Sequence, residues 1–177
     1  MQPESCPVFD GFELDATSGP ARLDALQRGR FCQTGLSRLY VARNADGEPI
    51  YAQWLVHAWE LPVLQAVTRR IYQPLGPGEV LVEGAYTFTA FRGLGAMADG
   101  QRQLLEVARL EGASSAVTYV APENVPSLRG CARVGFELDH VKVIRRRLGV
   151  ERIKVSSPDG NARTLWLAAV GRERHAV

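Results

Sequence analysis

Residues 79–100 read EVLVEGAYTFTAFRGLGAMADG, and this stretch decides the fold that we expect. Its first half is a run of apolar and β-forming residues, which is typical of a buried strand. Its second half opens with Gly93 and Gly95, after which apolar residues recur at the spacing of one helix face. That pattern ends at residues 111–112, where a glycine favours a helix end. The stretch therefore predicts a strand that passes through a glycine turn directly into a helix.

The glycine turn at residues 92–97 admits two interpretations. The first N–H groups of a helix lack intrahelical acceptors and carry a partial positive charge, so a helix that begins here could bind a phosphate. Gly93 and Gly95 would leave the backbone accessible, and Arg92 would add a formal charge. Alternatively, the glycines serve only the backbone angles of a tight turn. The segment has neither the GxxxxGK[ST] pattern of a P-loop nor the complete GxGxxG of a dinucleotide-binding fold.

The segments on either side predict an α/β or α+β domain. We expect the whole chain, 1–177, to form one domain with a mixed, mostly antiparallel sheet flanked by helices. Before the central stretch, the sequence predicts a helix at 17–31, a hairpin at 38–56 with its turn at 44–47, and a helical turn at 61–69. After it, the sequence predicts a strand at 114–121, a helix at 124–135, a strand at 136–148 and a second hairpin at 150–170 that turns at 158–160.

The composition is that of an ordinary globular chain, with 177 residues, 46% hydrophobic, 23% charged and a net charge of +2. So small a charge argues against a nucleic-acid or membrane partner, although the arginines at 145–147 form either a solvated strand edge or a contact for an anionic partner. The three widely spaced cysteines, Cys6, Cys32 and Cys131, favour a reduced, cytoplasmic protein. We also expect no signal peptide, no membrane span and no bound metal.

The helix that we expect after Asn124 has two unlike faces. Asn124, Ser127 and Cys131 fall at positions i, i+3 and i+7 of one face, whereas the residues between them include an apolar face. Such a helix can bury its apolar side and present the three polar residues to a cleft. Alternatively, Asn124 only caps the helix and Cys131 only fills space in the core.

Taken together, these segments resemble the GNAT superfamily of acyl-CoA-dependent N-acyltransferases. The resemblance rests on a strand, an R-G-x-G turn that opens a helix, a second strand, and an N-x-x-S pattern followed by Gly135-Phe136. The matching core covers residues 79–137, and the hairpin at 38–56 takes the place of the family's second and third strands. The resemblance implies a sheet that splays after its fourth strand and a C-terminal strand extension at 148–177. It also implies acetyl-CoA or another acyl-CoA as co-substrate, no metal, and transfer of a short acyl group to an amine of a small molecule or peptide.

The resemblance also assigns cofactor-binding residues. The backbone of Tyr86, Thr87 and Phe88 would bind the pantetheine arm and the thioester carbonyl, while Asn124 and Ser127 would contact the CoA arm from the next helix. The pyrophosphate would lie on the backbone N–H groups of Arg92, Gly93, Leu94, Gly95, Ala96 and Met97. Met97 departs from the family pattern, which has Gly or Ala at this position.

The resemblance implies a general acid and a general base, but it does not assign either role to a single residue of this chain. The family's general acid is a Tyr at the position of Cys131, which either protonates the leaving thiolate or fills space. Glu83 is the leading candidate for the general base. Glu79, an even number of residues away on the same predicted strand, is the second candidate. Tyr86 or Tyr119 could relay a proton through water. The structural alternative for Glu83 is an exposed carboxylate paired with a surface arginine.

Several alternatives concern partners. Tyr40, Trp54 and Trp59 either line an acceptor pocket or belong to the core. An acyltransferase that uses a carrier protein as donor would need a basic docking patch, which residues 145–147 could provide. A degenerate domain with a binding or scaffold role would account for Met97 and the missing Tyr. The hairpin strands and residues 148–177 offer an edge for a homodimer.

Overall fold

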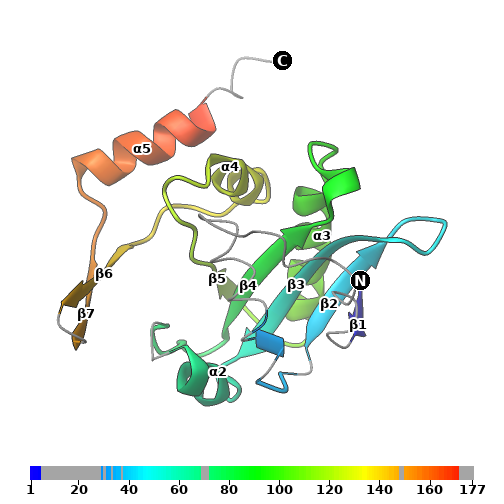
Figure 1. The fold of residues 1–177 in the computed structure, drawn as a ribbon, viewed down its shortest axis with the longest axis horizontal. Coiled ribbons are helices and arrows are strands. Elements are labelled where there is room, and N and C mark those ends of the chain that lie inside the picture. Colours follow the sequence, from blue (N-terminus) through cyan, green and yellow to red (C-terminus); the bar gives the residue numbers. More distant parts are fainter. Residues whose placement is uncertain are drawn as a thin grey trace. The chain divides into compact units, whose positions relative to one another are not determined.

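The computed structural model divides into two compact units, Met1–Tyr119 and Val120–Val177 (Figure 1). It describes residues 1–4, 29, 31–32, 34–36, 38–68, 72–147 and 150–171. The helix expected at 17–31 lies almost wholly outside the described residues, of which 29, 31 and 32 are helical. The organisation of the chain as one domain stays a prediction.

The first unit is built on a five-stranded sheet with the order β1-β2-β3-β4-β5. Its strands are β1 Gln2–Glu4, β2 Leu39–Arg43, β3 Pro49–His57, β4 Glu79–Thr87 and β5 Ser115–Val117. All neighbours are antiparallel except β4 and β5, which are parallel. A mixed, mostly antiparallel sheet is therefore confirmed, whereas β1 was not predicted and β5 is shorter than expected.

The predicted hairpin is present as β2 and β3, and its turn shows why the sequence folds this way. The side-chain oxygen of Asn44 accepts the N–H groups of Asp46 and Glu48 at 3.0 and 2.9 Å, and Gly47 has a φ of +84°. An Asx side chain and a glycine with positive φ are the features that close a tight turn.

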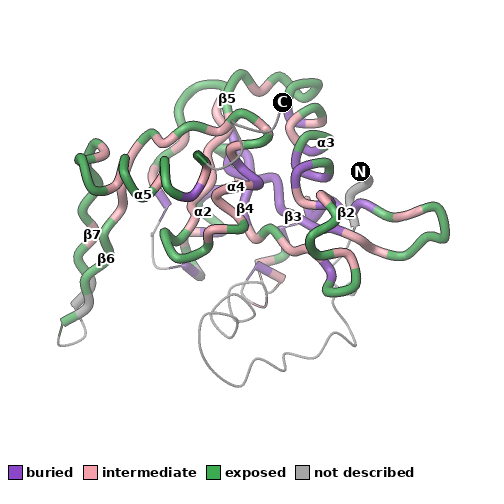
Figure 2. Tube along the Cα trace, turned by 90° about the horizontal axis from the view of Figure 1, so that it is seen from above, coloured by how far each residue is buried: buried purple, intermediate pink, exposed green. Residues whose placement is uncertain are grey.

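Helices cover both faces of the sheet. Helix α3, Ala96–Leu110, lies on the face that carries Tyr51, and helix α2, Leu61–Val67, lies over the face that carries Trp54. Both of these aromatic side chains are fully buried, and Figure 2 shows the buried residues concentrated along β3, β4 and the inner side of α3. The two layers hold β4 in the centre of the unit, with a single-turn helix, η2 Thr89–Phe91, between it and the glycine turn.

The second unit contains helix α4 Val125–Arg133, a two-stranded antiparallel sheet of β6 Val141–Arg147 and β7 Val150–Ser156, and helix α5 Gly160–Val170. Helices α4 and α5 pack together, and the Nε of Arg129 donates to the carbonyl of Ala169 at 2.8 Å.

The hairpin predicted at 150–170 is wrong, because β7 pairs with the preceding strand, β6, and residues 160–170 form a helix. The Asp-Gly pair that suggested a turn instead begins a helix: the carboxylate of Asp159 accepts the N–H of Ala162 at 2.8 Å. An aspartate is as favourable at a helix N-cap as in a turn, so the pair did not discriminate between the two.

The cysteines differ from one another. Cys32 is disulfide-bonded, so the expectation of reduced cysteines is wrong at this position. Cys131 is free and buried.

In the part of the chain that the structure describes, no helix combines the length and the apolar character that crossing a membrane requires.

Candidate functional site

Strand β4 contains a β-bulge at its centre. Ala52 pairs with Tyr86 and Trp54 pairs with Glu83, so two residues of β4 oppose the single residue between Ala52 and Trp54 on β3. One of the two is Gly84, which has a φ of +67°. A Cβ atom at Gly84 would lie 2.7 Å from Cε3 of the fully buried Trp54. The bulge therefore requires glycine both for its backbone angle and for its contact with the indole ring.

The bulge changes which side chains of β4 share a face. Side chains alternate along a strand, and directly paired residues lie on the same side of the sheet. Glu83 therefore shares a face with Trp54, and Tyr86 shares that face with Ala52. Without the extra residue, Glu83 and Tyr86 would point to opposite faces. The insertion brings a carboxylate and a phenol that the sequence analysis had singled out to one side of the sheet.

The edge of β4 toward β5 is paired only at its beginning. Glu79–Leu81 pair with Ser115–Val117, and among the described residues no strand continues this pairing beyond Leu81. The backbone of β4 thus runs for six further residues, 82–87, along an edge with no strand partner in the described chain.

Glu83 and Tyr119 flank the point where the two strands separate. Leu81 pairs with Val117 in a parallel register, so Glu83 lies on the face of Leu81, and Tyr119 follows two residues after the end of β5. Tyr119 packs against the core on this face, with its ring 5.6 Å from that of Tyr72. Two of the three predicted catalytic residues, Glu83 on β4 and Tyr119 just after the end of β5, therefore pack on one side of the sheet.

The surroundings of Glu83 contradict the exposed alternative. Its side chain belongs to a residue that is only 7% exposed, and Oε1 accepts the N–H of Gly84 at 3.2 Å. Glu79, the second candidate for the base, is half-buried and its Oε2 accepts the N–H of Gly76 at 3.0 Å. Glu79 therefore fixes the loop that precedes β4, while Glu83 lies at the bulge.

The end of β4 is an aromatic corner with a cation on it. The rings of Tyr86 and Phe88 meet edge to face at 5.0 Å, and Phe88 is buried. The Nε of Arg92 donates to the carbonyl of Thr87 at 3.1 Å, and its guanidinium carbon lies 5.8 Å from the centre of the Tyr86 ring. Arg92 is exposed, so its charge is held at the rim of the turn by two contacts.

The glycine turn leads directly into α3, as predicted. Gly93 and Gly95 have φ values of +78° and +84°, and a Cβ at either would meet no atom within 4 Å. Gly95 is the N-cap residue and supplies no side-chain cap. The first helical bond runs from the N–H of Asp99 to the carbonyl of Gly95 at 3.2 Å, which leaves the N–H groups of residues 96–98 without intrahelical acceptors.

The side chains of the turn differ in exposure. Leu94 is 74% exposed, Ala96 is buried and Met97 is half-buried. The acidic residue of the first helical turn, Asp99, forms an ion pair with Arg102 at 2.7 Å. The open space around both glycines and the missing cap are compatible with an anion at this turn. They are equally compatible with a tight connection that faces water.

The remaining predicted residues belong to the second unit. Asn124 caps α4 through its side-chain oxygen, which accepts the N–H of Ser127 at 3.3 Å, so its capping role is confirmed. Asn124 is exposed and Ser127 is half-buried. Cys131 is only 3% exposed, which favours the interpretation that it fills space inside the unit.

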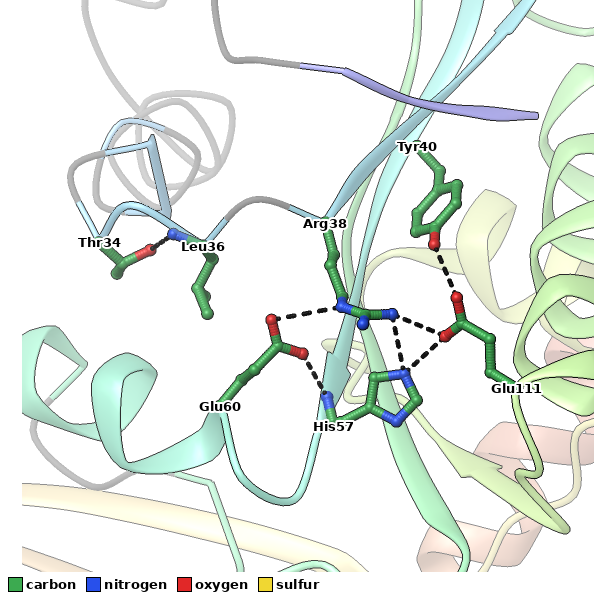
Figure 3. Close-up of polar contacts among 7 residues, drawn as sticks. All are labelled: Thr34, Leu36, Arg38, Tyr40, His57, Glu60 and Glu111. Atoms are coloured by element: carbon green, nitrogen blue, oxygen red, sulfur yellow. Dashed lines mark hydrogen bonds and ion pairs between the residues drawn. The ribbon is translucent and has the colours of Figure 1, made fainter.

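The sequence analysis missed a polar cluster at the other end of α3 (Figure 3). The Nε2 of His57 lies 2.8 Å from Oε2 of Glu111 and 3.3 Å from Nη1 of Arg38, and Arg38 donates to the same oxygen at 2.7 Å. Tyr40 donates to Oε1 of Glu111 at 3.3 Å, and Glu60 accepts the backbone N–H of His57 at 3.0 Å. The cluster ties the C-terminal end of α3 to strands β2 and β3.

The charges in this polar cluster shift two ionisation equilibria. Burial by itself would raise the pKa of Glu111, but the hydrogen bond with His57 and the nearby charge of Arg38 outweigh it, so the pKa is lowered. Burial and the charge of Glu111 raise the pKa of Tyr40 above its ordinary value. A carboxylate at a helix C-terminus opposes the helix dipole, and the charge of Arg38 together with the hydrogen bond from His57 compensates for it.

The aromatic residues offered for an acceptor pocket separate into two groups. Trp54 and Tyr40 are buried, so they belong to the interior of the first unit. Trp59 is 68% exposed and stacks on His57 with ring centres 4.2 Å apart. His57 pairs with Val80 near the start of β4, which places this aromatic stack at the end of β4 opposite the glycine turn.

Neither a metal centre nor a relative emerges from these observations. The described residues contain no group of three or more His, Cys, Asp or Glu side chains placed to hold a metal ion. Comparison with known proteins gives no match, either to a family model, to a curated protein or to a solved structure.

Proposed function

We propose that this chain is an N-acyltransferase that moves an acetyl or another short acyl group from acyl-CoA to an amine. The observation that carries the proposal is the course of β4. Its bulge, its unpartnered edge beyond Leu81 and the uncapped helix that follows it occur on one continuous segment, residues 82–98. By the resemblance to the GNAT family, the open strand edge would hold the pantetheine arm and the glycine turn with the helix start would hold the pyrophosphate.

In this proposal the acyl-CoA lies along the open edge of β4. The pantetheine amides hydrogen-bond to the backbone of residues 86–88, as an added strand would. The pyrophosphate lies on the free N–H groups at the start of α3, where the helix dipole favours an anion, and Arg92 adds a formal charge.

The reaction is a direct attack of the amine nitrogen on the thioester carbonyl. The new C–N bond forms, the C–S bond breaks, and the electron pair of that bond leaves on the CoA sulfur. Glu83 accepts the proton that the amine loses, because its carboxylate lies at the bulge beside the open edge. Tyr119, which follows the end of β5 and packs against the core on the same side of the sheet, donates a proton to the thiolate. The burial of Cys131 argues against it as the proton donor.

The test is calorimetric titration with acetyl-CoA, with 3′-dephospho-CoA and a pantetheine thioester as truncated ligands. Gly95→Glu places a carboxylate where the pyrophosphate would lie. Gly47→Glu is the matched control, because Gly47 also has a φ of +84° and no atom within 4 Å of its added Cβ. The account predicts binding that Gly95→Glu abolishes and Gly47→Glu preserves. No binding by the native protein would contradict the use of acyl-CoA.

A second assay tests the chemistry. Release of the CoA thiol is followed with a panel of primary amines, and Glu83→Gln is compared with Glu79→Gln. The account predicts that Glu83→Gln lowers kcat while acetyl-CoA still binds, and that Glu79→Gln does not. Equal loss in both variants would remove Glu83 from the role of base.

One further feature belongs to this proposal: the acceptor is a small-molecule or peptide amine. The cytoplasmic location expected from the sequence is not part of it, because Cys32 is disulfide-bonded and disulfides are rare in reducing compartments. If acyl-CoA does not bind, a carrier-protein donor and then a non-catalytic binding role become the alternatives.

A further inference from the structure

On one face of the two-stranded sheet in the second unit, every charged residue is an arginine or a lysine. Val143 pairs with Lys154, Arg145 with Arg152, and Arg147 with Val150. Paired residues share a face, and residues two apart on a strand share it as well. Four exposed side chains therefore lie on one face, called here the cationic face: Arg145, Arg147, Arg152 and Lys154.

No negative charge in the described structure neutralises the cationic face. Strands β6 and β7 contain one acidic residue, Glu151, whose backbone pairs with Arg146 at the neighbouring register position and not with any of the four cations. None of the four cations forms an ion pair or hydrogen bond with a described residue. The cationic face is thus free to meet an external anion.

The centre of the cationic face is an unfavourable arrangement. Arg145 and Arg152 are directly opposite one another across the two strands, and like charges at such positions destabilise an antiparallel pair. A ribbon of two strands is also only marginally stable without further support. A bound polyanion would remove the repulsion and stabilise the ribbon at the same time.

The distribution of charge along the chain agrees with this. Residues 120–177 contain eleven Lys and Arg against six Asp and Glu, a net charge of +5, while residues 1–119 contain ten against thirteen, a net charge of −3. The total of +2, from which we expected no nucleic-acid partner, averages two unlike parts. A basic segment of this kind is the electrostatic signature of a polyanion-binding surface.

We propose that the cationic face binds the phosphodiester backbone of double-stranded nucleic acid. Three of its four cations are arginines, whose planar guanidinium groups bind phosphate in a bidentate manner. A two-stranded ribbon has dimensions that the major groove of a duplex admits. Successive cations on one strand lie about 7 Å apart, and a duplex presents one negative charge for every ~1.7 Å of its axis, so several phosphates can be met at once.

Two other occupants fit less well. Proteins that bind single strands stack the bases on aromatic side chains, and residues 141–156 contain no aromatic residue. Protein interfaces have apolar centres that are depleted in charge, whereas the centre of the cationic face is an arginine pair. The proposal is independent of acyl transfer, because it uses no residue assigned to that reaction.

The experiment is fluorescence anisotropy with the full chain and labelled duplexes of about 20 base pairs, long enough to expose many phosphates. Separate arms use duplex DNA, duplex RNA and single strands over a series of salt concentrations. If all four cations neutralise phosphates on DNA, log Kd should change with log salt by a slope of about 3.6. The DNA and RNA arms identify which duplex is preferred.

The variants are matched in charge. Arg145→Gln/Arg152→Gln removes two cations from the cationic face and should lower the salt slope by about 1.8. Arg102→Gln/Arg109→Gln removes two exposed cations from α3 and should leave the slope unchanged. The midpoint of thermal unfolding at low salt should not fall in the ribbon variant, because the variant removes a repulsive pair. This measurement separates lost binding from lost folding.

Three results would overturn the proposal. The first is no binding to either duplex at about 50 mM salt, where non-specific electrostatic binding is strong. The second is equal weakening by the two double variants. The third is tighter binding to single strands than to either duplex.

Discussion

Replacing Gly84 with alanine should cost the protein a large share of its stability. The left-handed backbone at φ +67° costs an L-residue about 1–2 kcal/mol. The new methyl group would lie 2.7 Å from Cε3 and 3.0 Å from Cζ3 of Trp54, which is fully buried. Overpacking of this kind costs about 1–3 kcal/mol, so the total is roughly 2–5 kcal/mol. Domains of this size are stable by about 5–15 kcal/mol.

The assay is urea unfolding followed by far-ultraviolet circular dichroism. Gly112→Ala is the control, because Gly112 has a φ of +93° but no atom within 4 Å of an added Cβ. The control should lose only the backbone part, about 1–2 kcal/mol. The excess loss in Gly84→Ala measures the contact with Trp54. Equal losses in the two variants would refute the bulge geometry, because they would mean that the indole ring does not lie over Gly84.

Four other outcomes are expected. Gly100→Ala should lower the unfolding midpoint although alanine favours a helix by about 1 kcal/mol, because its Cβ would overlap the ring of Tyr51; a raised midpoint would contradict that packing. The pKa of Glu111 is lowered in the folded state, so the stability difference between the wild type and Glu111→Gln should be present at neutral pH and disappear as the pH falls below that pKa, by at most about 1 kcal/mol for this partly exposed group; a difference that persists in acid would argue against the ionic contacts. The Cys131 thiol should react with a thiol reagent only after unfolding, and rapid labelling of the native protein would contradict its burial. Asn124→Ala should cost about 1 kcal/mol in thermal unfolding through loss of the α4 cap, and no change would remove the cap from the account.

Local signals predicted the parts of the fold that depend on local chemistry. The turn at 44–47 is closed by an Asn side chain and a glycine, both visible in the sequence. The passage from β4 through Gly93 and Gly95 into α3 follows from a change of hydrophobic period at two glycines. The Asp159-Gly160 pair shows the limit of such signals, because the same residues suit a turn and a helix N-cap.

The bulge in β4 could be suspected but not located from the sequence. A glycine inside a strand often marks a bulge, and Gly84 is such a glycine. Its effect, however, depends on the register between β3 and β4, which pairs Trp54 with Glu83 across the sheet. Register is a property of two segments together. The sequence therefore singled out Glu83 and Tyr86 without showing that they share a face.

The polar cluster of Arg38, His57 and Glu111 was out of reach for the same reason. These residues are distant in the chain and meet only because α3 returns along the sheet and ends beside β2 and β3. Each has an ordinary local context, so no spacing rule connects them.

Amide hydrogen exchange with and without acetyl-CoA tests the central claim most directly. If the acyl-CoA lies along β4 and on the start of α3, exchange should slow in peptides that cover residues 82–98 and stay unchanged in those that cover 141–156. Gly95→Glu should abolish the slowing, and Gly47→Glu should leave it intact. Slowed exchange confined to other segments, or no change at saturating acetyl-CoA, would contradict the assignment of this segment as the cofactor site.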